Sequence, residues 1–352
     1  MKAAPLERLR AHAVAHSLFP PTSLAHAIER MAFVQADPIR CPARAQDLIL
    51  RHRVRGYRAG DLERRYPSLD LEEDYLYAYG FLPRRIWTLL HPRRTSPFSA
   101  LERRVLDIVR RIGSAHPRDL EAHLGHRRVT NAWGGQSKAT TRALDDLQYR
   151  GLLRVARREG GIRVYEAASP LADAASPETR LRRLVMVVAD LLAPVPERSL
   201  FATIARFRRL GPPRAAVADL LRDGELRRET IDGDAYVWPA RAAGSEGDLR
   251  VVRFLAPFDP LVWDRRRFEH LWEWPYRFEA YVPPAKRVRG YYAMPLLWGT
   301  RVIGWANAQM VAGSLDVDVG FVGRRPAGAE FRAALQEEIA RLEEFLRPSP
   351  SR

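Results

Sequence analysis

Apolar residues recur at helical spacing in one long stretch of the chain and then give way to alternating segments. The first helix starts at Leu101 and is ended by Gly113. Two more helices and two strands follow, with turn residues Glu159-Gly160-Gly161 between the strands. These four segments lie at 116–124, 137–149, 152–156 and 162–165. Three helices followed by a hairpin are typical of a winged helix, which we predict over residues 99–172.

The same order of segments recurs in the next part of the chain. Three helical stretches precede two alternating segments that turn at Asp232-Gly233-Asp234. The expected elements lie at 181–192, 200–208, 214–222, 226–230 and 235–238. Repetition of one arrangement indicates duplication. We therefore predict a second winged helix over residues 173–246.

The two ends of the chain follow other patterns. Residues 1–98 have helical stretches at 5–15, 23–31 and 43–53, which we interpret as a divergent winged-helix unit. Residues 247–352 change to short strand-like runs and finish with a helical apolar stripe. Those runs lie at 251–255, 276–281, 291–298, 301–307 and 315–321, and the stripe at 329–346. The expected fold class is α+β, with tandem winged-helix (helix-turn-helix) repeats followed by a small C-terminal β domain and a terminal helix.

Composition indicates a class of partner. The 352 residues carry a formal charge of +16, from 58 basic and 42 acidic side chains, which favours nucleic acid. No apolar run reaches the roughly 20 residues that span a bilayer, and residues 1–10 do not resemble a secretory signal. We therefore expect no membrane partner and a cytoplasmic location. Cys41 is the only cysteine, which excludes an internal disulfide and a multi-thiolate metal site.

Basic residues on the third helix of each predicted repeat are candidates for contacts with DNA. Lys138 and Arg142 lie on the first such helix, and Arg214 and Arg222 lie on the second. Winged helices commonly place this helix in the major groove while the wing touches phosphates. The alternative is that the repeats bind proteins and that these side chains are ordinary solvated surface.

The most defined chemical feature is the segment Gln35-Ala36-Asp37-Pro38. Pro38 disfavours helix at Asp37, and in an extended chain the side chains of Gln35 and Asp37 point to the same side. One amide and one carboxylate can hold a water molecule. Together they suffice to hydrolyse an N-glycosidic bond when the leaving base is already cationic, because no general acid is then needed.

Two questions about this segment stay open at the level of sequence. Asp37 either stabilises charge that develops on the sugar or helps to deprotonate the water. Alternatively, Asp37 is only a turn residue before Pro38, and Gln35 is a surface or capping group.

Two longer motifs resemble those of a known family. Val34–Arg40 followed by Ala43-Arg44-Ala45, and the run Leu255–Arg266, are similar to segments of bacterial winged-helix DNA glycosylases, the azinomycin-resistance and YcaQ-like enzymes that unhook interstrand crosslinks. The resemblance covers nearly the whole chain. We expect the apolar and turn residues of the second motif to serve folding.

The resemblance implies a fold, an activity and residue roles. The fold would be tandem winged helices with a β domain, and Asp37 would be the catalytic carboxylate with Gln35 positioning the water, without a metal or an organic cofactor. A β-hairpin would probe DNA beside the lesion, and residues 281–290 are our candidate, although the His-x-Pro motif of the azinomycin-type enzymes is not matched. DNA-binding residues would then be Arg40, Arg44, Lys138, Arg142, Pro283, Pro284, Lys286, Arg287 and Arg289.

The sequence therefore predicts a monofunctional DNA repair glycosylase. We expect it to hydrolyse N7-alkylated guanines in double-stranded DNA, including bulky adducts and interstrand crosslinks, and to leave an abasic site. We expect a monomer that associates with the bacterial nucleoid. The alternatives are a transcription regulator without catalytic activity and an adaptor that binds other proteins through its β domain.

Overall fold

The chain forms two compact units. The computed structural model describes residues 5–93, 97–125, 128–130, 136–169, 175–241 and 250–347. Unit 1 combines Met1–Asp61 with Pro177–Arg352, and unit 2 is Leu62–Ser176. The four predicted domains stay a prediction, because compactness does not test whether segments are repeats. Their boundaries at 172/173 and 246/247 lie outside the described residues.

Unit 2 contains the first predicted repeat. Strand β4 pairs with β8, and β8 pairs with β7, all antiparallel. Ser99 starts α6 through a capping box with Glu102, which satisfies two backbone N–H groups at the helix start. The elements are η1 Tyr66–Ser68, β2 Leu71–Tyr75, β3 Tyr79–Pro83, α5 Arg84–Leu90, α6 Ala100–Ile112, β4 Ser114–Ala115, α7 Pro117–Leu124, β5 Arg128–Thr130, β6 Gln136–Lys138, α8 Ala139–Arg150, β7 Leu153–Glu159 and β8 Ile162–Ala167.

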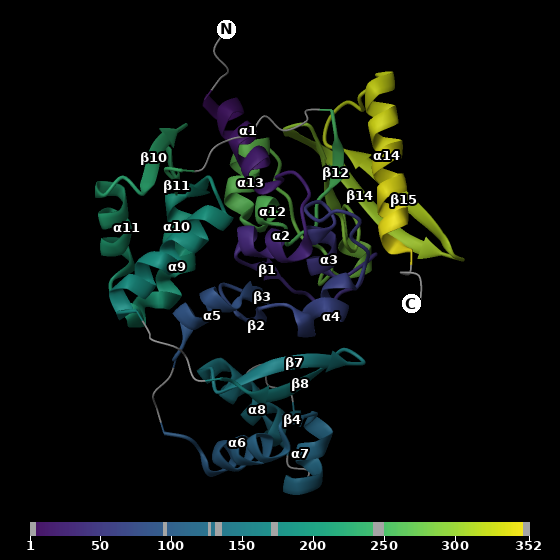
Figure 1. Cartoon of the computed structure of the whole chain (residues 1–352). Coiled ribbons are helices and arrows are strands. Elements are labelled where there is room, and N and C mark those ends of the chain that lie inside the picture. Colours follow the sequence, from purple (N-terminus) through teal and green to yellow (C-terminus); the bar gives the residue numbers. More distant parts are fainter. Residues whose placement is uncertain are drawn as a thin grey trace. The chain divides into compact units, whose positions relative to one another are not determined.

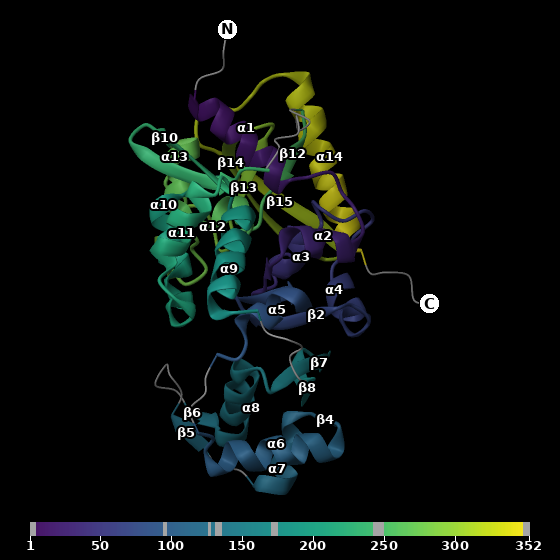
Figure 2. The ribbon, with the colours of Figure 1, turned by 60° about the vertical axis from the view of Figure 1, so that its left-hand side comes forward.

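The second predicted repeat lies in unit 1 and has a similar order of elements. Its hairpin β10–β11 is joined by the short strand β9, which pairs with β11 as β4 pairs with β8 in unit 2. Its helices pack on one another (Figure 2). The elements are α9 Pro177–Leu191, β9 Val195–Pro196, α10 Glu197–Ile204, η2 Ala205–Leu210, α11 Pro213–Arg222, β10 Leu226–Ile231 and β11 Asp234–Pro239. The winged-helix assignment of both segments stays an interpretation of this shared order.

An antiparallel sheet of order β12-β13-β14-β15 occupies the C-terminal part of unit 1, with α14 along it (Figure 1). The rings of Trp298 and Phe331 meet between sheet and helix, with centroids 5.1 Å apart. The elements are β12 Val252–Phe254, α12 Pro260–Trp263, α13 Arg265–Trp272, η3 Pro284–Lys286, β13 Met294–Trp298, β14 Arg301–Val311, β15 Ser314–Phe321 and α14 Ala329–Leu346.

One expectation for this region is wrong, and two of its helices were not predicted. Residues 276–281 do not form a strand, because Tyr276 is buried in an aromatic cluster with Phe268 and Trp274 instead of pairing along a sheet edge. Helices α12 and α13 were not expected. Asp259 and Asp264 start them, each accepting backbone N–H groups from the first turn.

The N-terminal helices of unit 1 join this C-terminal region through one apolar core. Helix α1 contributes Leu9, Ala13 and Val14 to a buried cluster that also contains residues of β11, α13, β13 and β14. The N-terminal elements are α1 Pro5–Ser17, α2 Leu24–Met31, β1 Val34–Gln35, α3 Ala45–Leu50 and, at the boundary of the units, α4 Asp61–Arg65. The two ends of the chain therefore fold as one body.

A fully buried ion pair links the turn that follows α3 to the start of α12. Arg53 donates from Nη1 and Nη2 to the two carboxylate oxygens of Asp259, at 2.8 and 3.0 Å, and both side chains are 0% exposed. Arg53 also donates to the carbonyls of Ser17 and Ile49, and Asp259 accepts the N–H of Leu261. The second motif thus has the structural role that we expected for it.

The two residues before Arg53 hold the sheet and α14 in the same way. Arg51 donates to the carbonyl of Phe254 and to the carboxylate of Glu338, which also accepts the Phe254 N–H at 2.7 Å. The ring of His52 lies 2.9 Å from the same Phe254 carbonyl through Nε2. Helix α3 is therefore fixed to β12, α12 and α14 by the three residues that directly follow it.

We expect Asp259→Ala to lower the free energy of unfolding by about 3–5 kcal/mol, because Arg53 would stay buried without its counter-ion. The measurement is urea denaturation of the full chain. The control is Glu7→Ala, which removes an exposed ion pair to Arg301 and should cost no more than about 1 kcal/mol. A similar small loss in both variants would contradict the importance of the buried pair.

Candidate active site and nucleic-acid interface

The loop that connects β1 to α3 carries the Gln35-x-Asp37 pair. Gln35 ends β1, and Asp37 follows in non-helical backbone before Pro38, as expected. The carboxylate oxygen Oδ1 of Asp37 accepts the N–H of Ile39 at 2.9 Å. Its own N–H lies 3.4 Å from Oε1 of Gln46 on α3. The loop is thus tied to α3, and one carboxylate oxygen is held by the backbone.

Gln35 carries a buried acceptor without a partner. Its Oε1 makes no hydrogen bond with any of the residues that the structure describes. An unpaired buried acceptor costs about 1–3 kcal/mol of stability, so such groups call for a functional explanation. The side chain of Gln35 as a whole is half-buried, which leaves it close to the surface.

The Asp37 carboxyl is half-buried and has a raised pKa. Loss of hydration raises the pKa, and the hydrogen bond from the Ile39 N–H opposes this shift. Catalytic carboxylates commonly have a pKa that their surroundings shift in this way. No counter-cation contacts it in the part of the chain described by the structure.

The two arginines of this loop are placed differently. Arg40 is exposed, whereas Arg44 is half-buried at the start of α3. Burial raises the pKa of Asp47, and the charge of Arg44 is one of the influences that oppose this shift. Arg40 is therefore the better placed of the two for a phosphate.

Residues 281–290 form an ordered loop with a short 3₁₀ turn, and not the β-hairpin that we expected, because no strand precedes it. The buried carboxylate of Glu279 accepts the N–H groups of Val288, Arg289 and Gly290 at 2.9, 2.9 and 3.2 Å. Gly290 has φ 123°, and a Cβ there would lie 2.3 Å from Oδ1 of Asn307. The buried carboxylate of Glu279 thus holds the C-terminal end of the loop in place.

The basic side chains of this loop are not equivalent. The guanidinium group of Arg289 lies over the rings of Trp274 and Trp305, 5.0 and 5.7 Å from their centroids. Arg287 stacks on Tyr291 and donates to a backbone carbonyl of the loop. Lys286 is exposed and makes no side-chain hydrogen bond or ion pair among the described residues.

Large apolar side chains protrude from the same loop. Tyr281 is 81% exposed and Val288 is 77% exposed, and Pro283 and Pro284 lie between them in sequence on the surface. Proteins that bind the minor groove frequently insert apolar side chains between base steps. The roles of Pro283, Pro284, Lys286, Arg287 and Arg289 at DNA stay predictions.

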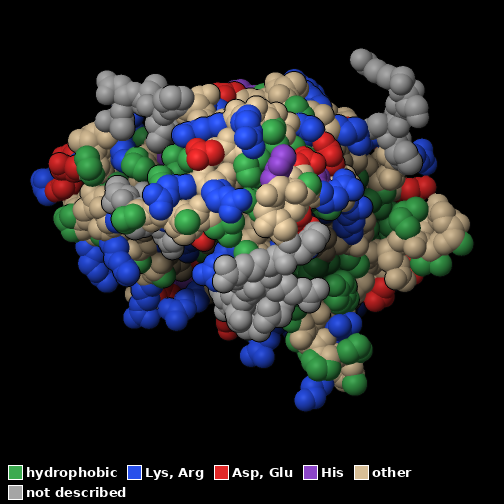
Figure 3. Space-filling view, turned by 90° about the horizontal axis from the view of Figure 1, so that it is seen from below, with side chains coloured by type: hydrophobic (Ala, Val, Ile, Leu, Met, Phe, Trp, Pro, Cys, Tyr) green, Lys and Arg blue, Asp and Glu red, His purple; other side chains and the backbone are tan. Residues whose placement is uncertain are grey.

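The predicted DNA-contacting residues of the two repeats have acidic or aromatic neighbours. Lys138 lies 2.7 Å from a carboxylate oxygen of Glu121, and Arg142 lies 3.9 Å from that of Asp146. In unit 1, Arg222 pairs with Asp219, and Arg214 stacks on Phe201. Figure 3 shows Lys and Arg side chains spread over one face, with acidic side chains among them.

Unit 2 contains an acidic strand that the sequence analysis missed. Glu72, Glu73 and Asp74 of β2 are all buried. Arg154 and Arg158 of β7 donate to Glu72 and Glu73, at 2.8 and 2.9 Å. Three consecutive acidic residues in a strongly basic chain were the available signal. The arginines of this hairpin are therefore engaged inside unit 2.

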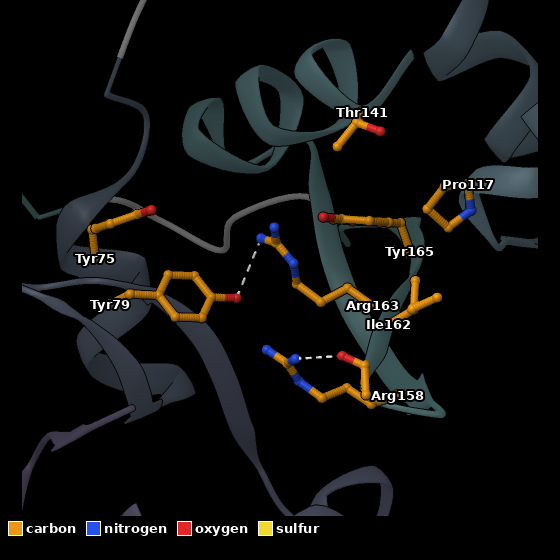
Figure 4. Close-up of a pocket in the computed structure, with 9 residues that line it drawn as sticks. Tyr75, Tyr79, Pro117, Thr141, Arg158, Ile162, Arg163 and Tyr165 are labelled. Carbon is orange, nitrogen blue, oxygen red and sulfur yellow. Dashed lines mark hydrogen bonds between the residues drawn. The ribbon is translucent and has the colours of Figure 1, made fainter. Parts of the chain in front are cut away.

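A cavity of about 370 Å³ opens beside these ion pairs in unit 2. Figure 4 shows Tyr75 and Tyr79 on one side and Arg158, Arg163 and Tyr165 on the other. Nη2 of Arg163 lies 3.0 Å from Asp145, and Arg158 pairs with Glu73. Because both positive charges already have counter-ions, this cavity is less suited to an anion than its lining suggests.

The described residues also bear on metal binding and on membrane insertion. No group of three or more His, Cys, Asp or Glu side chains among the described residues is arranged to hold a metal ion. No helix within the described parts of the chain is long and apolar enough to cross a membrane. The absence of a cofactor and of a membrane partner stay predictions.

Comparison with known proteins identifies the family. The model of a family described as DNA glycosylase AlkZ-like matches residues 28–345. The DNA glycosylase AlkZ of Streptomyces sahachiroi has a similar structure, with a TM-score of 0.62 over 98% of this chain and 97% of that chain, at 15% sequence identity. That likeness shows a shared mixed α/β fold, and neither comparison supports the alternative of a transcription regulator. The family match spans most of the chain and includes the Gln35-x-Asp37 segment, so the chain belongs to the AlkZ-like DNA glycosylase family.

Proposed function

We propose that this protein is a monofunctional glycosylase that removes N7-alkylated guanines from double-stranded DNA, including bulky adducts and interstrand crosslinks, and leaves an abasic site. The observation that carries the proposal is the closeness in sequence of a half-buried carboxylate, Asp37, and a buried amide oxygen, Gln35 Oε1, that has no hydrogen-bond partner among the described residues. Both groups can accept a hydrogen bond from the same water molecule.

Hydrolysis of the glycosidic bond needs only these two hydrogen-bond acceptors and the water molecule that they hold. An N7-alkylated guanine is a cation, so its bond to C1′ breaks with the electron pair going to the base, which leaves as a neutral molecule. The oxygen of the water attacks C1′, and its proton passes to the carboxylate of Asp37. The negative charge of the same carboxylate stabilises the positive charge that develops on the sugar.

The exposure of the site supports large lesions as substrates. Asp37 and Gln35 are half-buried, and Pro38 and Arg40 beside them are exposed. A crosslinked base is tied to the opposite strand and cannot swing fully into a sealed pocket. A carboxylate near the surface can instead reach the sugar while the base stays close to the duplex.

The proposed DNA contacts follow from the exposure of each basic side chain. We assign phosphate contacts to Arg40 and Lys286, which are exposed, with Arg44, Lys138, Arg142 and Arg287 in secondary positions. Arg289, held by two tryptophan rings, stiffens the loop of residues 281–290. Pro283 and Pro284 restrict its backbone, so that Tyr281 and Val288 meet the DNA bases. The protein acts as a monomer with tandem winged-helix units on bacterial DNA.

Replacement of the carboxylate tests the catalytic assignment. We expect Asp37→Asn to lower the single-turnover rate of base release by about 10²–10⁴-fold, because the amide keeps the bond to Ile39 but carries no charge. The substrates are duplexes with N7-methylguanine or a nitrogen-mustard crosslink, and alkali-labile abasic sites are counted. Asp316→Asn, an exposed carboxylate on β15, is the control. Equal rates in the wild type and Asp37→Asn would remove Asp37 from the reaction.

The rate should depend on pH through Asp37. The carboxylate form is active, so kcat/KM is expected to fall as pH falls through a pKa above the ordinary aspartate value of about 3.9. The shift is upward because burial outweighs the bond from Ile39. A bound cationic base favours the carboxylate, so the midpoint for kcat should lie below that for kcat/KM. A midpoint at or below 3.9 for kcat/KM, with circular dichroism showing folded protein, would contradict this expectation.

The salt dependence of DNA affinity tests the assigned contacts. We expect Lys286→Gln to weaken binding to undamaged duplexes of any sequence and to lower the slope of log affinity against log salt by about one. Fluorescence anisotropy measures both quantities. Arg301→Gln, which removes an exposed cation that is paired with Glu7, should leave the slope unchanged. An unchanged slope for Lys286→Gln would exclude this lysine from the interface.

A further inference from the structure

Tyr292 has a buried hydroxyl group that forms no hydrogen bond within the described part of the chain. Its side chain is 2% exposed, and no atom among the described residues bonds to the hydroxyl oxygen. Other buried tyrosines are satisfied: Tyr276 donates to the carbonyl of Ala293 at 2.7 Å, and Tyr57 donates to Asp47 at 2.7 Å. A buried tyrosine hydroxyl normally has such a partner, so Tyr292 is an exception that lowers stability.

The position of Tyr292 relates this hydroxyl to the candidate active site. Tyr292 lies just before β13, and its ring meets that of Phe278 edge-on, with centroids 5.3 Å apart. The loop with Asp37 lies against the neighbouring strand, because Sγ of Cys41 is 3.9 Å from the Ala308 carbonyl of β14. Burial and then the carboxylate of Asp37 raise the pKa of Tyr292 well above its ordinary value. The hydroxyl therefore stays protonated and lies within the electrostatic reach of Asp37.

We propose that Tyr292 is a third catalytic residue, whose hydroxyl donates a hydrogen bond to the water molecule that Gln35 and Asp37 hold against C1′ of the damaged nucleotide. This inference rests on the proposed glycosylase function. In this arrangement a single water molecule is the hydrogen-bond partner of both the Tyr292 hydroxyl and the Gln35 amide oxygen.

The hydrogen-bonding capacity of water fits these three groups. A water molecule donates two hydrogen bonds, here to Oε1 of Gln35 and to the carboxylate of Asp37, and accepts two. One lone pair accepts the Tyr292 O–H, and the other faces C1′. During the reaction the water proton passes to Asp37, the oxygen bonds to C1′, and the base takes the electron pair of the broken bond. Tyr292 orients the water and keeps its own proton throughout.

Two tyrosine-to-phenylalanine variants give opposite expectations. Tyr292→Phe should slow single-turnover release of N7-methylguanine about tenfold, the size of one lost hydrogen bond. Its unfolding temperature should stay the same or rise, because no bond within the protein is lost. Tyr276→Phe loses the bond to Ala293 and should unfold at a lower temperature while retaining the wild-type rate at saturating enzyme. Affinity for undamaged duplex should be unchanged in both.

The outcomes separate this inference from the proposed function. A wild-type enzyme that releases no base from any alkylated duplex overturns the function and the inference together. A wild-type rate in Tyr292→Phe overturns the inference alone, as does a slow variant that is also less stable than Tyr276→Phe. In a Gln35→Ala background, Tyr292→Phe should cost clearly less than tenfold, because the two groups share one water. An undiminished tenfold loss would exclude the shared water.

Discussion

The ion pair between Arg53 and Asp259 is the interaction on which unit 1 depends. It is fully buried, bidentate and completed by further hydrogen bonds to the ends of α1 and α3 and to the first turn of α12. Two buried charges are tolerable only when they satisfy each other in this way. The pair fixes α3 on the C-terminal region, and α3 holds the loop with Asp37 through Gln46. The position of the carboxylate therefore follows from an ion pair outside the active site.

The candidate active site differs from this ion pair in the hydrogen bonding of its buried polar groups. Around Arg53 the structure pairs charges and polar groups. In contrast, Gln35 and Tyr292 each keep a buried polar atom that no described residue bonds, and the pKa of Asp37 is raised by burial. Such groups lower stability and are retained where a substrate or a water molecule completes them. The ion pair of Arg53 and Asp259, with its hydrogen bonds, offsets the loss of stability at the candidate active site.

The positive charge of the chain is also divided between two uses. Part of it is neutralised internally, as where Glu72 and Glu73 of β2 bind Arg154 and Arg158 of the adjacent hairpin. Part is held by aromatic rings, as for Arg289. Only the remaining cations, such as Lys286, can attract phosphate without first breaking another contact. A net charge of +16 therefore overstates the number of cations available to DNA.

The sequence by itself determined the elements that have a local cause. Helices such as α6 and α14 and the hairpins β7–β8 and β10–β11 follow from apolar spacing and turn residues, and the spacing of Gln35 and Asp37 before Pro38 marked the candidate site. Only the tertiary structure decided that residues 276–281 bury aromatic rings instead of forming a strand, and that Glu279 anchors the following loop. It alone brought Tyr292 near Asp37 and Asp259 to Arg53. These pairs lie far apart in the chain, and their contacts depend on which groups folding removes from water together, which no local pattern records.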